Sequence, residues 1–289
     1  MLPPSVPSDR NASLIGIAAA FGAQLSMNLG AGFAKQLFPV VGAYGMTALR
    51  VTLAAMLLMA LRRPWRRRLP RAMLPALIAY GAMLGLMNLL IYQAFARIPL
   101  GIATGIEVIG PLAIVLLGSR RPRDFLWLAA AICGLLLLLP LRAHDRLDSV
   151  GITFALGAAA CWALYIIYGK RVSGALGRDA VAWGMVVSAT FTLPIGLATS
   201  GAAMFAPGVL ATGFGIALLS SALPYSLEME AMRRVPATVF GILVSATPAI
   251  AALAGFVVLG EVLTPLQWGA ILCIIAAAAG SALSATRRA

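Results

Sequence analysis

The stretch MNLLIYQAFARIPLGIATGIEVIGPLAIVLLGSRRPR, residues 87–123, decides the fold of the chain. It leaves one long apolar segment, turns at the Ile-Pro pair of residues 98–99, and enters a second apolar segment that carries Glu107 and Pro111 in its interior. A carboxylate inside an apolar span is costly unless it faces protein or water, so Glu107 is the first candidate for a functional residue. A similar turn recurs at residues 234–236.

The composition around this stretch is that of a membrane protein. The chain is 61% hydrophobic and 11% charged, with a mean hydropathy of +0.95, more apolar surface than a soluble domain can bury. We therefore expect an all-α integral membrane fold of ten transmembrane helices, since the short alternating strands of a barrel are absent from the sequence. The predicted spans are residues 14–34, 42–61, 72–96, 101–118, 124–140, 149–169, 180–199, 208–229, 237–259 and 264–284.

The net charge of +13 is distributed by side of the membrane. With a cytoplasmic N-terminus, seventeen of the 22 Lys and Arg residues fall on the inner side, four on the outer side, and Arg50 lies within a span. This bias follows the positive-inside rule and predicts a multi-pass protein with both termini in the cytoplasm. The arginine-rich loop at residues 62–71 is then expected to fix orientation and contact anionic lipid of the bilayer, and nucleic acid is not an expected partner.

The residues that usually bind metals or carry out catalysis are scattered. Cys133, Cys161 and Cys273 lie in apolar spans and His144, the only histidine, in an outer loop, so we expect no metal site and no cofactor. An integral-membrane enzyme acting on lipid-linked substrates is the alternative of another class. Such an enzyme needs a nucleophile with a base, a metal cluster or clustered carboxylates, and the sequence therefore favours a protein that is not an enzyme.

The two Ile/Val-Pro turns belong to an internal repeat. Each turn proline is followed twelve residues later by a second proline, and the two pairs are offset by 137 residues. The pairs are Pro99 with Pro111, and Pro236 with Pro248. Duplication predicts one five-helix repeat in residues 1–146 and another in residues 147–289. An odd number of crossings places the repeats in opposite orientations, as in many transporters that alternate access between the two sides of the membrane.

The first candidates for a binding site lie at similar predicted depths in the membrane. At the rise of an α-helix, Arg50 and Glu107 both lie about 10 Å below the outer ends of their spans. Asn88 and Tyr92 lie at about the same depth, and their four-residue spacing places them on one face of the third span. In the second repeat the polar residues, Tyr225 among them, move toward the cytoplasmic side.

Each candidate also has a purely structural explanation. Glu107 could pair with Arg50 and pin two spans together, and Arg50 could instead extend to the outer surface. Tyr80 and Trp162 could line a cavity or serve as packing and interface anchors. Ser245, in the ninth span, is a further candidate for the binding site.

Four segments resemble a known family: GFAKQLFPVVGAYGMTALR (32–50), MNLLIYQAFARIPLGIATGIEVIGPLA (87–113), SSALPYSLEMEAMRRVPATVFGIL (220–243) and VVLGEVLTPLQ (257–267). They are similar to the EamA-type transporters of the drug/metabolite transporter superfamily, and within it to the bacterial threonine/homoserine exporter group. The likeness extends over about residues 14–284. It implies two inverted five-helix repeats with a central pocket built mainly from spans three, four, eight and nine. It also implies export of amino acids across the bacterial inner membrane.

Position by position, the resemblance assigns Arg50 to the family's second-span arginine, Glu107 to the carboxylate of its IE-x-x-GP stretch, and Glu261 to its LGE glutamate. Helix-end structure is the alternative explanation for Glu261. The chain has Gly-Ser-Arg at residues 118–120 where the general family repeats LGE, a departure that the exporter group shares. Thr247 stands where a glutamate is expected in that group.

The predicted function is export of small, threonine- or homoserine-like amino acids or related metabolites by alternating access, either proton-coupled or facilitative. Glu107 would bind the ammonium group of the substrate, and Arg50 or backbone dipoles its carboxylate. Export of aromatic amino acids or drugs is the alternative within the class, because pocket volume cannot be read from a sequence. The oligomeric state is left open, a monomer included.

Overall fold

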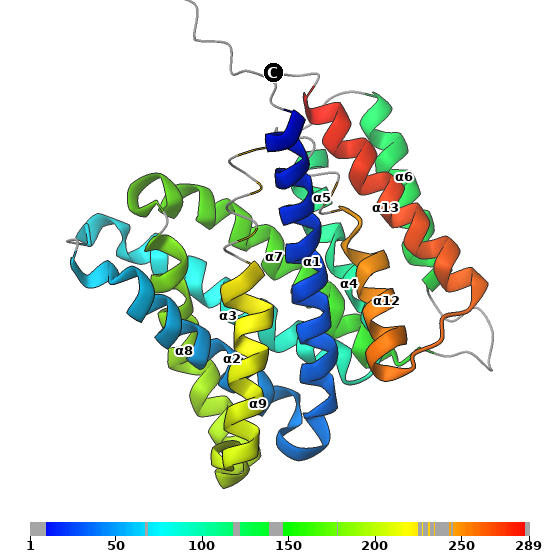
Figure 1. Cartoon of the computed structure of the whole chain (residues 1–289). Coiled ribbons are helices and arrows are strands. Elements are labelled where there is room, and N and C mark those ends of the chain that lie inside the picture. The colour runs from blue at the N-terminus through cyan, green and yellow to red at the C-terminus, as the bar shows by residue number, and fades with distance from the viewer. Residues whose placement is uncertain are drawn as a thin grey trace, which may run out of the picture.

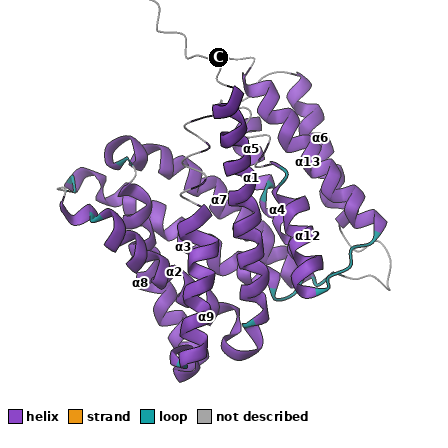
Figure 2. Cartoon of the chain, viewed as in Figure 1, coloured by secondary structure: helices purple, strands orange, loops and turns teal. Residues whose placement is uncertain are grey.

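A computed structural model describes residues 10–66, 69–117, 122–138, 147–177, 179–224 and 245–286, together with the single positions 227, 231, 234 and 243. Helices make up almost all of these residues, and no strand occurs among them (Figure 2). The predicted all-α class is therefore confirmed.

The helices follow the predicted spans closely (Figure 1). The first half holds α1 (Arg10–Gln36), α2 (Phe38–Arg62), α3 (Leu74–Phe95), α4 (Leu100–Glu107), α5 (Ile109–Leu117) and α6 (Pro122–Leu138), with 3-10 turns η1 (Pro64–Arg66) and η2 (Arg71–Met73). The second half holds α7 (Ser149–Leu176), α8 (Asp179–Ser200), the 3-10 turn η3 (Gly201–Phe205), α9 (Pro207–Ala217), the π-helical η4 (Leu218–Ala222), α12 (Thr247–Leu259) and α13 (Pro265–Thr286). Parts of the predicted eighth and ninth spans lie outside the described residues.

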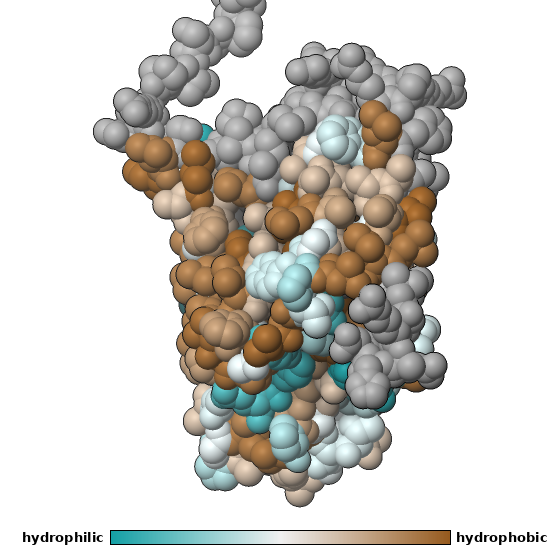
Figure 3. Space-filling model, turned by 90° about the vertical axis from the view of Figure 1, so that its right-hand side faces the viewer, coloured by the Kyte–Doolittle hydropathy of each residue, from teal (hydrophilic) through white to brown (hydrophobic). Residues whose placement is uncertain are grey.

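Length and composition identify membrane-crossing helices in the described part of the chain. Five helical segments are long and apolar enough to cross a bilayer: residues 14–36, 38–62, 71–95, 149–169 and 179–205. Four shorter apolar helices cover residues 100–114, 207–221, 247–259 and 265–277. Large apolar side chains such as Leu61, Leu126 and Val257 remain exposed, and Figure 3 shows apolar residues over much of one face. This surface suits lipid, in which apolar side chains need no burial.

The fourth predicted span is broken after Glu107, where α4 ends and α5 begins at Ile109. Pro111 lies four residues beyond Glu107 and has no backbone N–H to donate to the Glu107 carbonyl oxygen. The proline ring also crowds that carbonyl, which interrupts the helix at this point. The carboxylate of Glu107 consequently projects from the end of a short helix rather than from the middle of a long one.

The first helix of each predicted repeat packs on the other repeat. α1 packs more extensively on α12 and η4 than on α2, and it lies beside α12 in Figure 1. Conversely, α7 packs chiefly on α3, with further contacts to α4 and α5. Close approach is possible where side chains are small, as at Gly30 against Ser220 and at Gly101 against Ala252. This exchange of helices brings α1 and α7 to the centre of the molecule.

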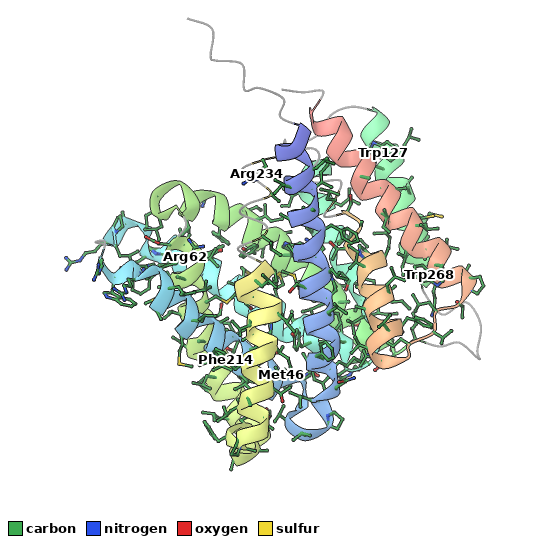
Figure 4. All side chains as sticks on the ribbon, in the orientation of Figure 1. Met46, Arg62, Trp127, Phe214, Arg234 and Trp268 are labelled. Atoms are coloured by element: carbon green, nitrogen blue, oxygen red, sulfur yellow. The ribbon has the colours of Figure 1, made fainter. Side chains whose placement is uncertain are left out.

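The side chains divide into a packed interior and an outward-facing surface (Figure 4). Met46 of α2 is fully buried in the largest apolar cluster, which also contains Ile98, Leu100 and Ile102 from the turn before α4 and from α4 itself. Phe214 of α9 is 46% exposed. The largest core therefore surrounds the start of α4, the short helix that carries Glu107.

Candidate functional site

A cavity of about 230 Å³ lies among α1, α2, α3, α4, α7, η4 and α12. Its lining is mixed, with apolar side chains such as Met27, Leu84 and Phe95 between the polar ones. The polar and aromatic lining residues are Gln24, Asn28, Arg50, Asn88, Tyr92, Thr104, Glu107, Trp162, Tyr165, Ser220 and Thr247. Arg50, Asn88, Tyr92, Glu107 and Trp162 were predicted from the sequence, and the structure brings these five together around one space.

Arg50 is held in place by two residues of α3. Its guanidinium group donates a hydrogen bond to Oδ1 of Asn88, and it lies over the ring of Tyr92 at 4.9 Å from the centroid. Asn88 is fixed in turn, because its Nδ2 donates to the carbonyl oxygen of Leu84 at 2.7 Å. Nε of Arg50 is buried and has no hydrogen-bond partner in the described part of the chain. The guanidinium group is therefore oriented and still has a donor available for an anion.

Tyr92 combines a packed ring with an unpaired hydroxyl group. Its ring contacts Phe38 and Phe95, at centroid distances of 5.7 and 5.6 Å. The hydroxyl group is buried, and among the described residues it has no hydrogen-bond partner. An unpaired buried polar atom costs free energy, and two such atoms belong to Tyr92 and Arg50, which both line this cavity.

Glu107 lines the same cavity from the end of α4. Within the described residues its carboxylate forms no ion pair and no hydrogen bond, with Arg50 or with any other side chain. A salt bridge between Glu107 and Arg50 is therefore not formed among the described residues. The lining of the cavity thus contains one positive and one negative side chain, Arg50 and Glu107.

The cavity is also lined by four polar residues that were not predicted from the sequence: Gln24, Asn28, Thr104 and Ser220. Asn28 Nδ2 donates to the carbonyl oxygen of Gln24 at 2.8 Å, and Thr247 Oγ1 donates to Gln24 Oε1 at 2.8 Å. Ser220 lies in the π-helical turn η4. The spacing of Gln24 and Asn28, four residues apart in an apolar span, is a signal that could have identified them.

The remaining predicted residues lie elsewhere. Tyr80 does not line the cavity, because its ring stacks on Tyr165 at a centroid distance of 4.8 Å and its side chain packs in a cluster with Leu77 and Val172. Tyr80 thus supports the lining residue Tyr165, and their hydroxyl oxygens are 3.2 Å apart. Ser245 is buried next to α12 but is not among the lining residues, and Tyr225 lies outside the described residues.

Glu261 joins three parts of the fold beyond the cavity. Its Oε1 lies 2.5 Å from Lys35 Nζ at the end of α1, and its Oε2 accepts a hydrogen bond from the backbone N–H of Leu100 at 2.9 Å. Lys35 Nζ also donates to the carbonyl oxygen of Ile98 at 3.3 Å. The positive φ of Gly260, 68°, turns the chain so that Glu261 folds back against α12. We call Lys35, Glu261, Ile98 and Leu100 the α4 clasp.

An apolar helical bundle whose cavity is lined by polar and charged side chains has the architecture of a membrane transporter. The chain belongs to the EamA-like transporter family, whose model matches residues 149–283. It is accordingly a member of a family of transporters and not an enzyme.

Two named relatives are similar to this chain over about nine-tenths of its length, and a third over a shorter part. The threonine/homoserine exporter RhtA of Escherichia coli (strain K12) is 46% identical over 263 residues, which cover 91% of this chain and 89% of that protein. RhtA of Salmonella typhimurium (strain LT2) is 46% identical over 266 residues, covering 92% and 90%. The uncharacterized transporter YwfM of Bacillus subtilis (strain 168) is 29% identical over 178 residues, covering 58% and 60%.

A solved crystal structure shares the fold. It superposes with a TM-score of 0.65 at 19% sequence identity, over 97% of this chain and 99% of the other. One expectation drawn from the family resemblance needs extension. The resemblance implies a cavity mainly from spans three, four, eight and nine, whereas α1, α2 and α7 also line it, because α1 packs on α12 and η4 and α7 packs on α3 and α4.

Proposed function

We propose that the protein exports small, threonine- or homoserine-like amino acids from the cytoplasm across the bacterial inner membrane. The observation that carries the proposal is the cavity lined by Arg50, Tyr92 and Glu107, in which the guanidinium and carboxylate groups form no salt bridge with each other. The identity of 46% to a threonine/homoserine exporter over nine-tenths of the chain supports the same substrate class.

The lining groups match the two charges of an amino acid. Glu107 binds the α-ammonium group, and the α-carboxylate accepts hydrogen bonds from Arg50 Nε and the Tyr92 hydroxyl group. Such charge-assisted hydrogen bonds are the stronger ones, and a water-poor cavity strengthens them further. Asn88 does not need to touch the substrate, because its contribution is to hold the guanidinium group of Arg50.

The size of the cavity favours small substrates over the alternatives. Pockets for drug-sized ligands occupy roughly 300–1,000 Å³. The present cavity measures about 230 Å³, and Trp162, Tyr165 and Phe95 already fill part of its wall. Export of small amino acids is thus better supported than export of drugs, while the assay below compares threonine with an aromatic amino acid.

Transport by alternating access would use the predicted inverted repeats, residues 1–146 and 147–289, with both termini in the cytoplasm. The asymmetric placement of Lys and Arg supports that orientation. In a proton-coupled cycle Glu107 would also carry the proton, being the one carboxylate among the described lining residues. All described lining residues come from one chain, so the proposed site does not depend on a second copy.

Counterflow in proteoliposomes tests the proposal. The wild-type protein, preloaded with unlabelled threonine, should accumulate radiolabelled threonine and homoserine, with phenylalanine as the bulky comparison. Glu107→Gln should lower threonine uptake about 30-fold or more, since the loss of one partner of a buried charge pair costs that much affinity. Repeating the assay with and without a pH gradient separates proton-coupled from facilitative transport.

Asp148→Asn is the matched control for Glu107→Gln. Asp148 pairs with Arg97 at 3.5 Å near the start of α7, and it does not line the cavity. The two variants change a carboxylate to an amide in the same way, and only the first should impair uptake. Unchanged counterflow by a correctly folded Glu107→Gln protein would refute the role of this residue.

A further inference from the structure

The wall of the cavity formed by α7 carries a large and rigid side chain, that of Trp162. It is the only tryptophan among the described lining residues, and it is half-buried, facing the cavity while it packs against the largest apolar cluster. Other apolar lining residues, Met27 and Met87, have unbranched, flexible side chains that adapt to a neighbour. An indole ring has only two side-chain torsions and cannot adapt in that way.

The backbone of α7 is fixed on both sides of Trp162 by close packing at glycines. Before Trp162, the carbonyl oxygen of Ala159 lies directly against Gly110 of α5, where a Cβ atom would overlap with it. After Trp162, a Cβ atom on Gly169 would lie 3.2 Å from the ring of Tyr80 in α3. Helices packed this closely have no room to shift, so the indole ring stays in place when a substrate enters the cavity.

We propose that Trp162 is the specificity-determining residue that limits the size of the transported amino acid and excludes aromatic side chains from the cavity. The inference rests on the proposed function, in which Arg50, Tyr92 and Glu107 bind the α-carboxylate and α-ammonium groups common to all amino acids. With those two groups held by α2, α3 and α4, the side chain of the substrate occupies the remaining space. The indole ring of Trp162 bounds that space on the side of α7.

The discrimination between side chains follows from packing. A substrate side chain that reaches the fixed indole ring overlaps with it, and overpacking of this kind is unfavourable. The indole ring is larger than the phenyl ring of phenylalanine, so its removal leaves room for a phenyl ring. An apolar space of about 150 Å³ is enough to hold benzene. Threonine and homoserine lose only apolar contact with the ring, and their uptake should therefore change little.

Counterflow of threonine and of phenylalanine in proteoliposomes provides the test. The wild type should prefer threonine over phenylalanine by about tenfold or more, the discrimination that an apolar wall can give against a larger side chain. Trp162→Ala should lower that ratio about tenfold, mainly through faster uptake of phenylalanine. Trp162→Phe keeps a smaller ring at the same place and should give a ratio between those of the wild type and Trp162→Ala.

A matched variant and a second measurement separate the size limit from a general structural effect. Trp268→Ala makes the same change in α13, which contributes none of the described lining residues, and it should leave the ratio unchanged (Figure 4). Binding can be measured apart from transport by thermal unfolding in detergent. Phenylalanine should raise the thermal midpoint of Trp162→Ala and not that of the wild type, because a ligand stabilises only a protein that binds it.

The outcomes distinguish this inference from the proposed function. If the wild type carries phenylalanine as well as threonine, or if folded Trp162→Ala keeps the full threonine-to-phenylalanine ratio, the size limit is overturned and the exporter proposal stands. Slower phenylalanine uptake by Trp162→Ala than by the wild type also overturns it, because the ring would then bind aromatic substrates. If the wild type carries neither threonine nor homoserine, both fall. If Trp162→Ala fails to fold, the ratio of Trp162→Phe decides.

Discussion

The cavity and the α4 clasp both place charged groups among apolar helices, and they differ in how those groups are paired. In the clasp, Lys35 Nζ contacts Glu261 Oε1 and the Ile98 carbonyl oxygen, while Glu261 Oε2 accepts from Leu100 N–H. In the cavity, Arg50 Nε and the Tyr92 hydroxyl group lack partners within the described residues. A saturated cluster stabilises the fold, whereas an unsaturated one is free to exchange ligands.

The two regions are connected by a single short helix. α4 begins at Leu100, whose N–H is bound by Glu261, and ends at Glu107 in the cavity. The carboxylate of Glu261, bound to the N–H of the first residue of α4, also lies at the positive end of the helix dipole, which is favourable. The clasp therefore anchors the N-terminal end of α4, the end opposite Glu107. Variants on the two sides should have different effects, on transport for the cavity and on stability for the clasp.

The largest effect is expected at Arg50. Arg50→Met removes the charge and Arg50→Lys replaces the planar guanidinium fork with a compact ammonium group that does not reach Asn88 and a carboxylate in the same geometry, so both should lower threonine counterflow about 100-fold. Arg97→Lys, a matched change at an arginine that does not line the cavity, should have little effect. Full activity of Arg50→Lys would show that the guanidinium geometry is not used.

Tyr92→Phe should have an intermediate effect. The change removes only the unpaired hydroxyl group and keeps the ring that packs against Phe38 and Phe95. We expect the apparent KM for threonine to rise about tenfold, the loss of one hydrogen bond to a charged group, with little change in the thermal midpoint. A midpoint that falls while KM stays constant would assign the hydroxyl group to the fold instead.

The clasp should respond in stability rather than in substrate affinity. Lys35→Met or Glu261→Gln should each lower the free energy of unfolding by about 1–2 kcal/mol, because one charged group is left without its partner in a largely buried place. The double variant should recover most of the loss, and KM for threonine should stay within about twofold in all three proteins. Thermal unfolding in detergent together with counterflow measures both quantities.

The smallest effect is expected at the Arg97–Asp148 ion pair. Its side chains are 34% and 40% exposed, so solvent screens their interaction. Asp148→Asn should change the free energy of unfolding by less than about 0.5 kcal/mol. If Asp148→Asn lowered the free energy of unfolding more than Glu261→Gln does, the exposed Arg97–Asp148 pair would be worth more than the largely buried clasp, contrary to this prediction.

Depth along each helix could be predicted from the sequence, but the direction in which a side chain points could not. Arg50, Asn88, Tyr92 and Glu107 were placed at one level by counting residues, and the structure confirms that they share a cavity. Tyr80 is on the same helix as Asn88, yet it does not line the cavity. Its ring stacks instead on that of the lining residue Tyr165. Spans that are apolar on every side give no periodic signal that distinguishes a cavity-facing residue from a packed one.

The polar residues of α1 were missed for a different reason. Gln24 lines the cavity only because α1 leaves its own repeat and packs on α12. Nothing local to residues 10–36 encodes that partner, since the contact is between segments more than 200 residues apart. The break after Glu107, by contrast, follows from Pro111 alone and is visible in the sequence.

The exchange of α1 and α7 between the repeats also has a consequence for biosynthesis. α1 is made first, but the helices on which it packs, η4 and α12, follow only when more than half of the chain has been synthesised. Until then Gln24 and Asn28 lie in a membrane helix without their final neighbours. The N-terminal five helices therefore cannot complete their packing as a unit ahead of the rest, and the cavity forms as one of the last steps of assembly.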